Sequence, residues 1–244
     1  MTSTTRNTRG NVTVNASSRV MRQAAAAAES TLARPRVTAA DVKAHYEAKI
    51  QAALVEAMAA GAGAEVAELQ GWWDLIALGP IQIPQINGPY LPNDVIRSGE
   101  PAFIVTVLIL NPFLVLNNQI TVCELLSTLA LPYEITYQTG NLTKWQPAPP
   151  PLTGEREDLY LVPHQCFYVD VLEFIPYDKD EVMYEMNISA RIFGCGENYA
   201  PPLAGFAREV VDFDPSFFAP APGLVGAPIR FLVYGNEPEE LPRV

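Results

Sequence analysis

The sequence predicts a mainly β protein, an antiparallel β-sandwich preceded by an α-helix and a flexible arm. Hydrophobic residues make up 49% of the 244 residues, which is enough to build a sizeable core. The 22 prolines and 15 glycines indicate many turns and extended segments. Short runs rich in β-branched and aromatic residues recur between residues 95 and 235, as in strands that are separated by turns.

Residues 1–35 are expected to form a flexible basic arm. Residues 1–36 contain six arginines and one glutamate, a net charge of +5, so the remainder must carry −16 to give the −11 of the whole chain. An acidic body repels nucleic acid, so only the arm could bind it. The Ser-, Thr- and Arg-rich composition also suits an organellar transit peptide, and that alternative stays open.

A helix is expected just after the arm, within a helical segment that we place at 36–78. Thr38 and Asp41 approximate a capping box at its start. Apolar residues then recur at every fourth position and form one stripe along the helix. The stripe consists of Val42, Tyr46, Ile50, Leu54 and Met58.

The glycines at 61–64 are expected to break this helix. The sequence that follows favours one or two further helical turns before Gly79. This stretch contains Trp72 and Trp73, whose loop-like surroundings suggest exposed aromatic contacts. The sandwich is then expected to occupy residues 79–244.

The most apolar part of the chain, residues 102–110, is predicted to be a strand with both faces buried. It is shorter than the ~20 residues of a membrane helix, and Asn111-Pro112 follows it, so no membrane span is expected. One face consists of Phe103, Val105, Val107 and Ile109. The second face consists of Ile104, Leu108 and Leu110. Because a sandwich strand normally exposes one face, we expect the helix stripe to cover the second face.

Further strands are expected at 95–97, 119–124, 133–138, 158–162, 166–175, 182–193, 207–211 and 229–235. The loop 176–181 is expected to join the strands at 166–175 and 182–193 as a hairpin. This spacing is similar to that of an immunoglobulin-like sandwich or a jelly roll, although the Cys–Trp–Cys spacing of true immunoglobulin domains is absent.

The three cysteines, Cys123, Cys166 and Cys195, are expected to be free thiols, because their number is odd and no CxxC spacing occurs. Free thiols favour a cytoplasmic location, with an organelle or a virion as alternatives. The expected hairpin brings His164 close to Cys166 and Cys195, which are weak candidates for a zinc site. A fourth ligand is missing, so we expect no metal and no cofactor.

No catalytic motif stands out, and we expect a non-enzymatic structural or scaffolding subunit. It would self-assemble into a homo-oligomer, ring, shell or filament by binding copies of itself or another protein. The expected interface comprises the helix stripe, Trp72, Trp73, the second strand face, and Phe217 and Phe218 of the proline-rich loop 196–228. One alternative is a sandwich module that binds a sugar or a peptide, and another is a metal-dependent enzyme.

Overall fold

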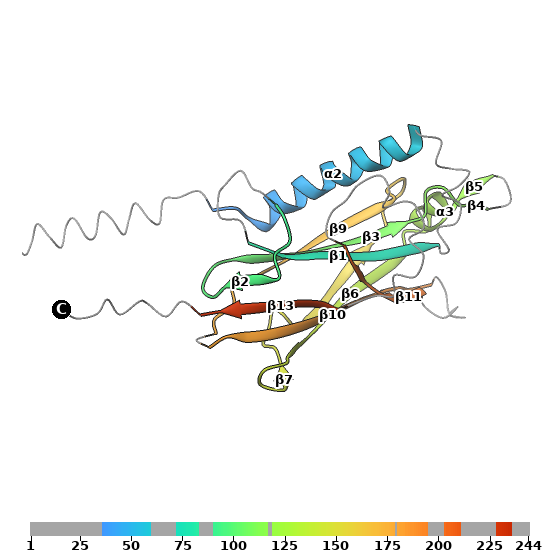
Figure 1. Ribbon diagram of the computed structural model, residues 1–244. Coiled ribbons are helices and arrows are strands. Elements are labelled where there is room, and N and C mark those ends of the chain that lie inside the picture. Colours follow the sequence, from blue (N-terminus) through green and yellow to red (C-terminus); the bar gives the residue numbers. More distant parts are fainter. Residues whose placement is uncertain are drawn as a thin grey trace, which may run out of the picture. The chain divides into compact units, whose positions relative to one another are not determined.

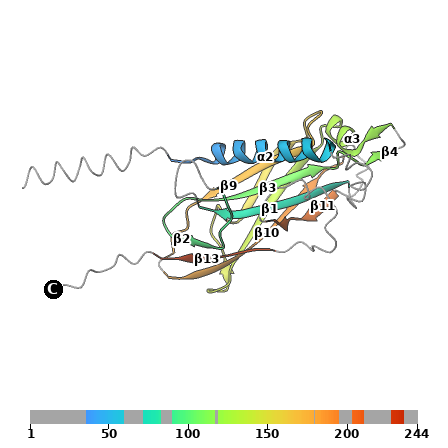
Figure 2. The same ribbon diagram turned by 45° about the horizontal axis from the view of Figure 1, so that its top comes forward.

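The computed structural model describes residues 36–59, 72–82, 90–116, 119–178, 180–194, 203–210 and 228–235 (Figure 1). These residues form a mainly β body in which two sheets face each other, with one long helix on the outside of the first sheet (Figures 1 and 2). The coarse prediction of a mainly β protein with an N-terminal helix is therefore confirmed.

Sheet I has four strands and sheet II is larger. The order in sheet I is β12 (Arg208–Glu209), β1 (Trp73–Ile81), β3 (Ala102–Leu110) and β9 (Phe167–Phe174). The order in sheet II is β2 (Val95–Arg97), β13 (Ile229–Tyr234), β10 (Val182–Ile192), β6 (Pro132–Asn141) and β7 (Gln146–Pro147). In addition, β11 (Leu203–Phe206) pairs with β10, and β8 (Gly154–Tyr160) pairs with β6. The remaining elements are the helices α2 (Ala39–Ala59) and α3 (Val122–Thr128) and the small pair β4 (Val115–Leu116) and β5 (Ile120–Thr121).

The main core lies between the two sheets, and alternation of side chains builds it. Every second residue of β10, from Val182 to Ile192, is buried, while the residues between them are exposed or half-buried. This is the pattern expected of a strand with one face on the core. A polar chain crosses this core: Thr106 and Asp170 of sheet I both bond the hydroxyl of Tyr137 in sheet II, at 3.2 and 2.8 Å. Burial and the nearby Asp170 raise the pKa of Tyr137 well above its usual value, so it stays protonated and donates to Asp170.

The second core lies between α2 and the outside of sheet I. The stripe residues Val42, Tyr46, Ile50 and Leu54 are buried there, whereas Met58 is 63% exposed. Ala57 is buried in place of Met58, because a stripe with a period of four drifts around a helix of 3.6 residues per turn. The Tyr46 hydroxyl donates a hydrogen bond to the carbonyl of Tyr90 at 2.9 Å, and the exposed His45 stacks on the Tyr90 ring. These two contacts connect the helix to the segment before β2.

Strand β3 is buried on both faces along its whole length, as predicted. A helix covers one of these faces, but it is not the face that we expected. Phe103, Val105, Val107 and Ile109 pack under α2, whereas Ile104, Leu108 and Leu110 point into the core between the sheets. Both faces consist almost wholly of apolar residues, with Thr106 the one polar residue, so the sequence could not decide which layer lies on which face.

The expected helical turns before Gly79 are wrong for the described residues, since Trp73–Ile81 form strand β1. β1 lies between β3 and β12, with Trp73 opposite Leu110. A short apolar run that is buried on both faces carries no period that separates strand from helix. Trp73 is partly buried rather than exposed, and its ring lies 3.1 Å from the position that a Cβ on Gly205 would take.

Two other strand predictions are corrected by the structure. The strands at 166–175 and 182–193 do not form a hairpin, because β9 pairs with β3 in sheet I and β10 pairs with β6, β11 and β13 in sheet II. The strand expected at 119–124 ends at Thr121, where α3 begins with a capping box between Thr121 and Glu124. The sequence T-x-x-E carried that signal.

Candidate docking surface

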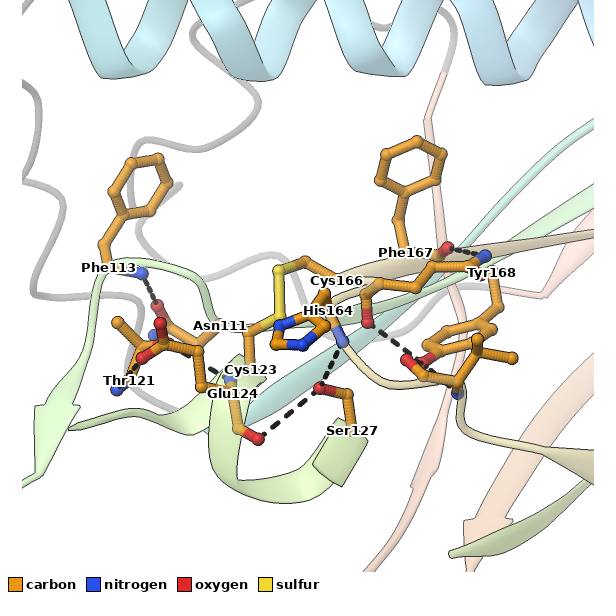
Figure 3. The surroundings of a disulfide bond; sticks show 12 residues. Asn111, Phe113, Thr121, Cys123, Glu124, Ser127, His164, Cys166, Phe167 and Tyr168 are labelled. Atoms are coloured by element: carbon orange, nitrogen blue, oxygen red, sulfur yellow. Dashed lines mark hydrogen bonds between the residues drawn. A yellow bond between two sulfur atoms is a disulfide. The ribbon is translucent and has the colours of Figure 1, made fainter. Parts of the chain in front are cut away.

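Two of the predicted site residues, Cys123 and Cys166, form a disulfide (Figure 3). The prediction of free thiols is therefore wrong for these two residues. The end of β3 brings them together: the Leu110 N–H donates to the Cys166 carbonyl at 2.8 Å, and the Cys123 N–H donates to the Asn111 carbonyl at 3.0 Å. Their Cα atoms are 5.3 Å apart, a normal disulfide spacing.

The zinc hypothesis loses a ligand because the Cys166 sulfur is bonded to Cys123 and is not a thiolate. His164 lies beside the disulfide, where its backbone N–H donates to the Ser127 hydroxyl at 3.2 Å (Figure 3). Cys195 lies outside the described residues. Among the residues that the structure describes, no three His, Cys, Asp or Glu side chains gather in a way that could hold a metal ion.

Most residues of the expected interface are used for packing inside the chain. Four of the five stripe residues and Ile104, Leu108 and Leu110 are buried in the two cores. Trp72 is 43% exposed, and Phe217 and Phe218 lie outside the described residues. The residues buried in the two cores are therefore not available for contact with a partner.

The outer face of sheet II carries a row of apolar side chains, which we call the apolar row, that crosses three strands and continues to the residue after a fourth. Strand register places Val95 beside Leu232 and Leu232 beside Met183. The Leu142 N–H donates to the Met183 carbonyl at 2.8 Å, which extends the row past the end of β6. Val95 and Met183 are 45% and 44% exposed, so the row is open to solvent.

Charged side chains flank the apolar row on both sides, and they are paired within the chain. On one side Arg230 contacts Glu185 at 2.8 Å. On the other side Arg97 contacts Glu100 at 3.0 Å, and its guanidinium lies over the Tyr234 ring. An apolar strip within a polar border is the usual composition of a protein contact surface.

The turn from β6 to β7 adds an aromatic side chain next to the row. Trp145 is 87% exposed, the highest value among the large hydrophobic side chains that the structure describes. Trp145 is the last residue of the four-residue loop between β6 and β7, and its backbone φ is +53°. In the same turn, Asn141 Oδ1 accepts a hydrogen bond from the Lys144 N–H at 2.8 Å. Gly or Asn usually occupies this left-handed conformation, because it is unfavourable for most other residues.

A second aromatic residue, Tyr177, is held near the same turn and is 79% exposed. Its neighbour Asp178 contacts Lys144 at 3.2 Å and accepts the hydroxyl of the core residue Tyr184 at 2.6 Å. Burial, together with Asp178, raises the pKa of Tyr184, so its hydroxyl stays protonated and donates. The loop that carries Tyr177 is thus tied both to the core and to the Trp145 turn.

The apolar row, Trp145 and Tyr177 together form what we call the end surface. Its side chains are apolar, aromatic or paired in salt bridges. Such a surface can pack against a partner and stack on it. The sequence alone does not reveal this surface, because the row draws on four distant segments that only strand register brings together. One local signal was available, the tryptophan within the polar turn NLTKWQ.

The chain matches no family model and no curated protein. Within the described residues, no helix has both the length and the apolar character needed to cross a bilayer.

Proposed function

We propose that this chain is a non-enzymatic structural subunit that associates with copies of itself through the end surface. The observation that carries the proposal is Trp145. Trp145 is 87% exposed and its backbone is in the left-handed region, and both features are unfavourable for an isolated chain. Contact with a partner would bury the ring and offset both costs, as aromatic residues do at the centre of interfaces.

Charge favours a second copy as the partner. The chain carries a net charge of −11, so two copies repel each other over most of their surface. At the end surface, however, Arg97, Lys144 and Arg230 each contact a carboxylate of the same chain. Two copies can therefore meet there without strong repulsion.

Sedimentation velocity of the full chain over a range of concentrations tests this function. We expect an oligomer for the wild type and dissociation of that oligomer in Trp145→Ser. Leu129→Ser, at a 48% exposed residue that caps α3, is the matched control and should not change the oligomer. A wild type that stays monomeric at high concentration, or a Trp145→Ser variant that associates normally, contradicts the proposal.

A second candidate function is a module that binds a sugar or a peptide. It is favoured by the two exposed rings of Trp145 and Tyr177 beside the Lys144–Asp178 ion pair. Rings of this kind stack on flat apolar faces, while the lysine ammonium donates hydrogen bonds and the carboxylate accepts them. A screen of soluble glycans and peptides by tryptophan fluorescence separates the two candidates, since a ligand that saturates a monomeric wild type supports this one.

We also propose that the sandwich is immunoglobulin-like rather than a jelly roll. The order β1-β3-β9 in one sheet and β8-β6-β10-β13 in the other supports this, because it corresponds to strands A-B-E and C′-C-F-G of immunoglobulin-like domains. The cytoplasmic location stays a proposal, and the Cys123–Cys166 bond argues against it because disulfides persist mainly in oxidising compartments.

A further inference from the structure

The outward side of α2 is uncharged over most of its length. On a helix of 3.6 residues per turn, the line opposite the buried stripe consists of Ala44, Ala48, Ala52, Val55 and Ala59. All five are exposed, and Val55 is 56% exposed. Met58 lies beside this line at 63% exposure. A helix on the surface of a protein usually presents charged residues on this side.

We propose that the outward face of α2 packs against the same face of α2 in a second copy, with the two helices antiparallel around a two-fold axis. An axis between residues 51 and 52 places Ala48 of each copy opposite Val55 of the other. A small residue then meets a large one on both sides of the axis. The same register places Ala44 opposite Ala59, so the helices can approach closely.

Charge complementarity supports this occupant and this direction. Lys49 and Glu56 lie on the same flank of the outward face, seven residues apart in the sequence. In the antiparallel register, Lys49 of one copy lies within about two residues, ~3 Å along the axis, of Glu56 of the other. The two-fold axis repeats the pair, so two opposite-charge contacts flank the apolar line. A parallel pair about a two-fold axis would instead place this flank of the two copies on opposite sides of the contact, so Lys49 and Glu56 would not meet.

This contact differs from the end surface in position and strength. It lies outside sheet I, whereas the end surface lies on the outer face of sheet II. A pair of 21-residue helices buries less than the ~1,200–2,000 Å² of a stable interface, so it should be weak by itself. If the proposed self-association at the end surface holds, two-fold contacts on opposite faces generate an extended chain of copies, and that consequence alone rests on the proposed function.

Engineered cysteines in the full chain test the geometry, in a Cys195→Ser background that retains the Cys123–Cys166 bond. Ala52→Cys lies beside the axis and should form a disulfide-linked dimer under mild oxidation. Ala44→Cys should not, because its two copies are about 22 Å apart in the antiparallel register. Equal cross-linking at both positions means a parallel pair and overturns the proposal, as does no cross-linking at either.

Charge reversal provides a second readout by sedimentation equilibrium. Lys49→Glu should weaken the helix contact several-fold, and Lys49→Glu combined with Glu56→Lys should restore it. Adding Trp145→Ser to each variant distinguishes the two contacts. Ala52→Cys dimers that persist in Trp145→Ser support the helix contact even if the proposed function fails. Association that depends on Trp145 but ignores both charge reversals overturns the helix contact alone.

Discussion

The two outer faces of the sandwich differ in how they are completed. On sheet I the outer side chains Phe103, Val105 and Val107 are at most 1% exposed, because α2 covers them. On sheet II the outer side of β10 alternates with its buried side, and Met183 is 44% exposed. An uninterrupted apolar strand thus corresponds to a face that another layer of the chain covers, whereas the apolar row lies on an alternating face that is open to solvent.

The largest effect should come from breaking the covered face. Ile50→Asp places a carboxylate in a position that is 1% exposed between α2 and sheet I. We expect a loss of more than ~4 kcal/mol in the free energy of unfolding, because the charge has no partner in an apolar contact. Urea denaturation measures it, and Gln51→Asp on the exposed side of the same helix is the control. Similar stabilities for the two variants would mean that α2 covers nothing important.

The disulfide should come next in size. It closes a loop over a sequence separation of 43 residues, for which chain entropy gives about 4 kcal/mol. We expect the wild type to lose much of this stability when a reductant is added, while Cys166→Ala is less stable at the start and insensitive to the reductant. Thermal unfolding with and without reductant provides the comparison, and equal sensitivity of both proteins would show that the bond does not stabilise the fold.

The core between the sheets can be probed at Tyr137. Tyr137→Phe removes the hydroxyl that links Thr106 to Asp170. Each of these two side chains then loses its hydrogen bond to residue 137. We expect a loss of about 1–3 kcal/mol in the free energy of unfolding. Tyr160→Phe, at a 58% exposed residue of β8, is the control and should be nearly neutral. A neutral Tyr137→Phe would mean that water replaces the hydroxyl without cost.

The open face should respond in the opposite direction. Trp145→Gly relieves the left-handed backbone at φ +53°, so we expect the free energy of unfolding of the monomer to rise by up to ~1 kcal/mol. Self-association should fall at the same time. Urea denaturation at low concentration, together with sedimentation velocity, measures the two effects. A variant that loses stability would show that the Trp145 ring supports the fold.

The smallest effect is expected at Glu209 of β12, at the edge of sheet I. Burial, and then the nearby Asp94, raise the pKa of Glu209. The folded state therefore binds this proton more tightly than the unfolded state, and stability falls as the pH rises from the usual glutamate pKa through the raised one. Glu209→Gln should be slightly more stable than the wild type at pH 7 and equal to it at pH 3. A stability difference that does not change with pH would rule out this cause.

Much of the fold could be predicted because it depends on local patterns of apolar and polar residues. The alternation in β10, the apolar run of β3 and the four-residue period of α2 each depend on neighbours along the chain. The pairing of these elements does not. β9 and β10 carry patterns that suit a hairpin, yet they lie in different sheets. The zinc hypothesis relied on that hairpin, and it also loses Cys166 as a ligand to the disulfide.

The sequence by itself determined which residues are apolar, where most of the long strands lie and that a helix precedes them, because side-chain period sets these features. Only the tertiary structure decided which face of β3 meets α2, that Cys123 meets Cys166, and that Val95, Leu142, Met183 and Leu232 share one row. The physical reason is that burial is a property of each residue, whereas strand order and register depend on contacts between segments that are distant along the chain.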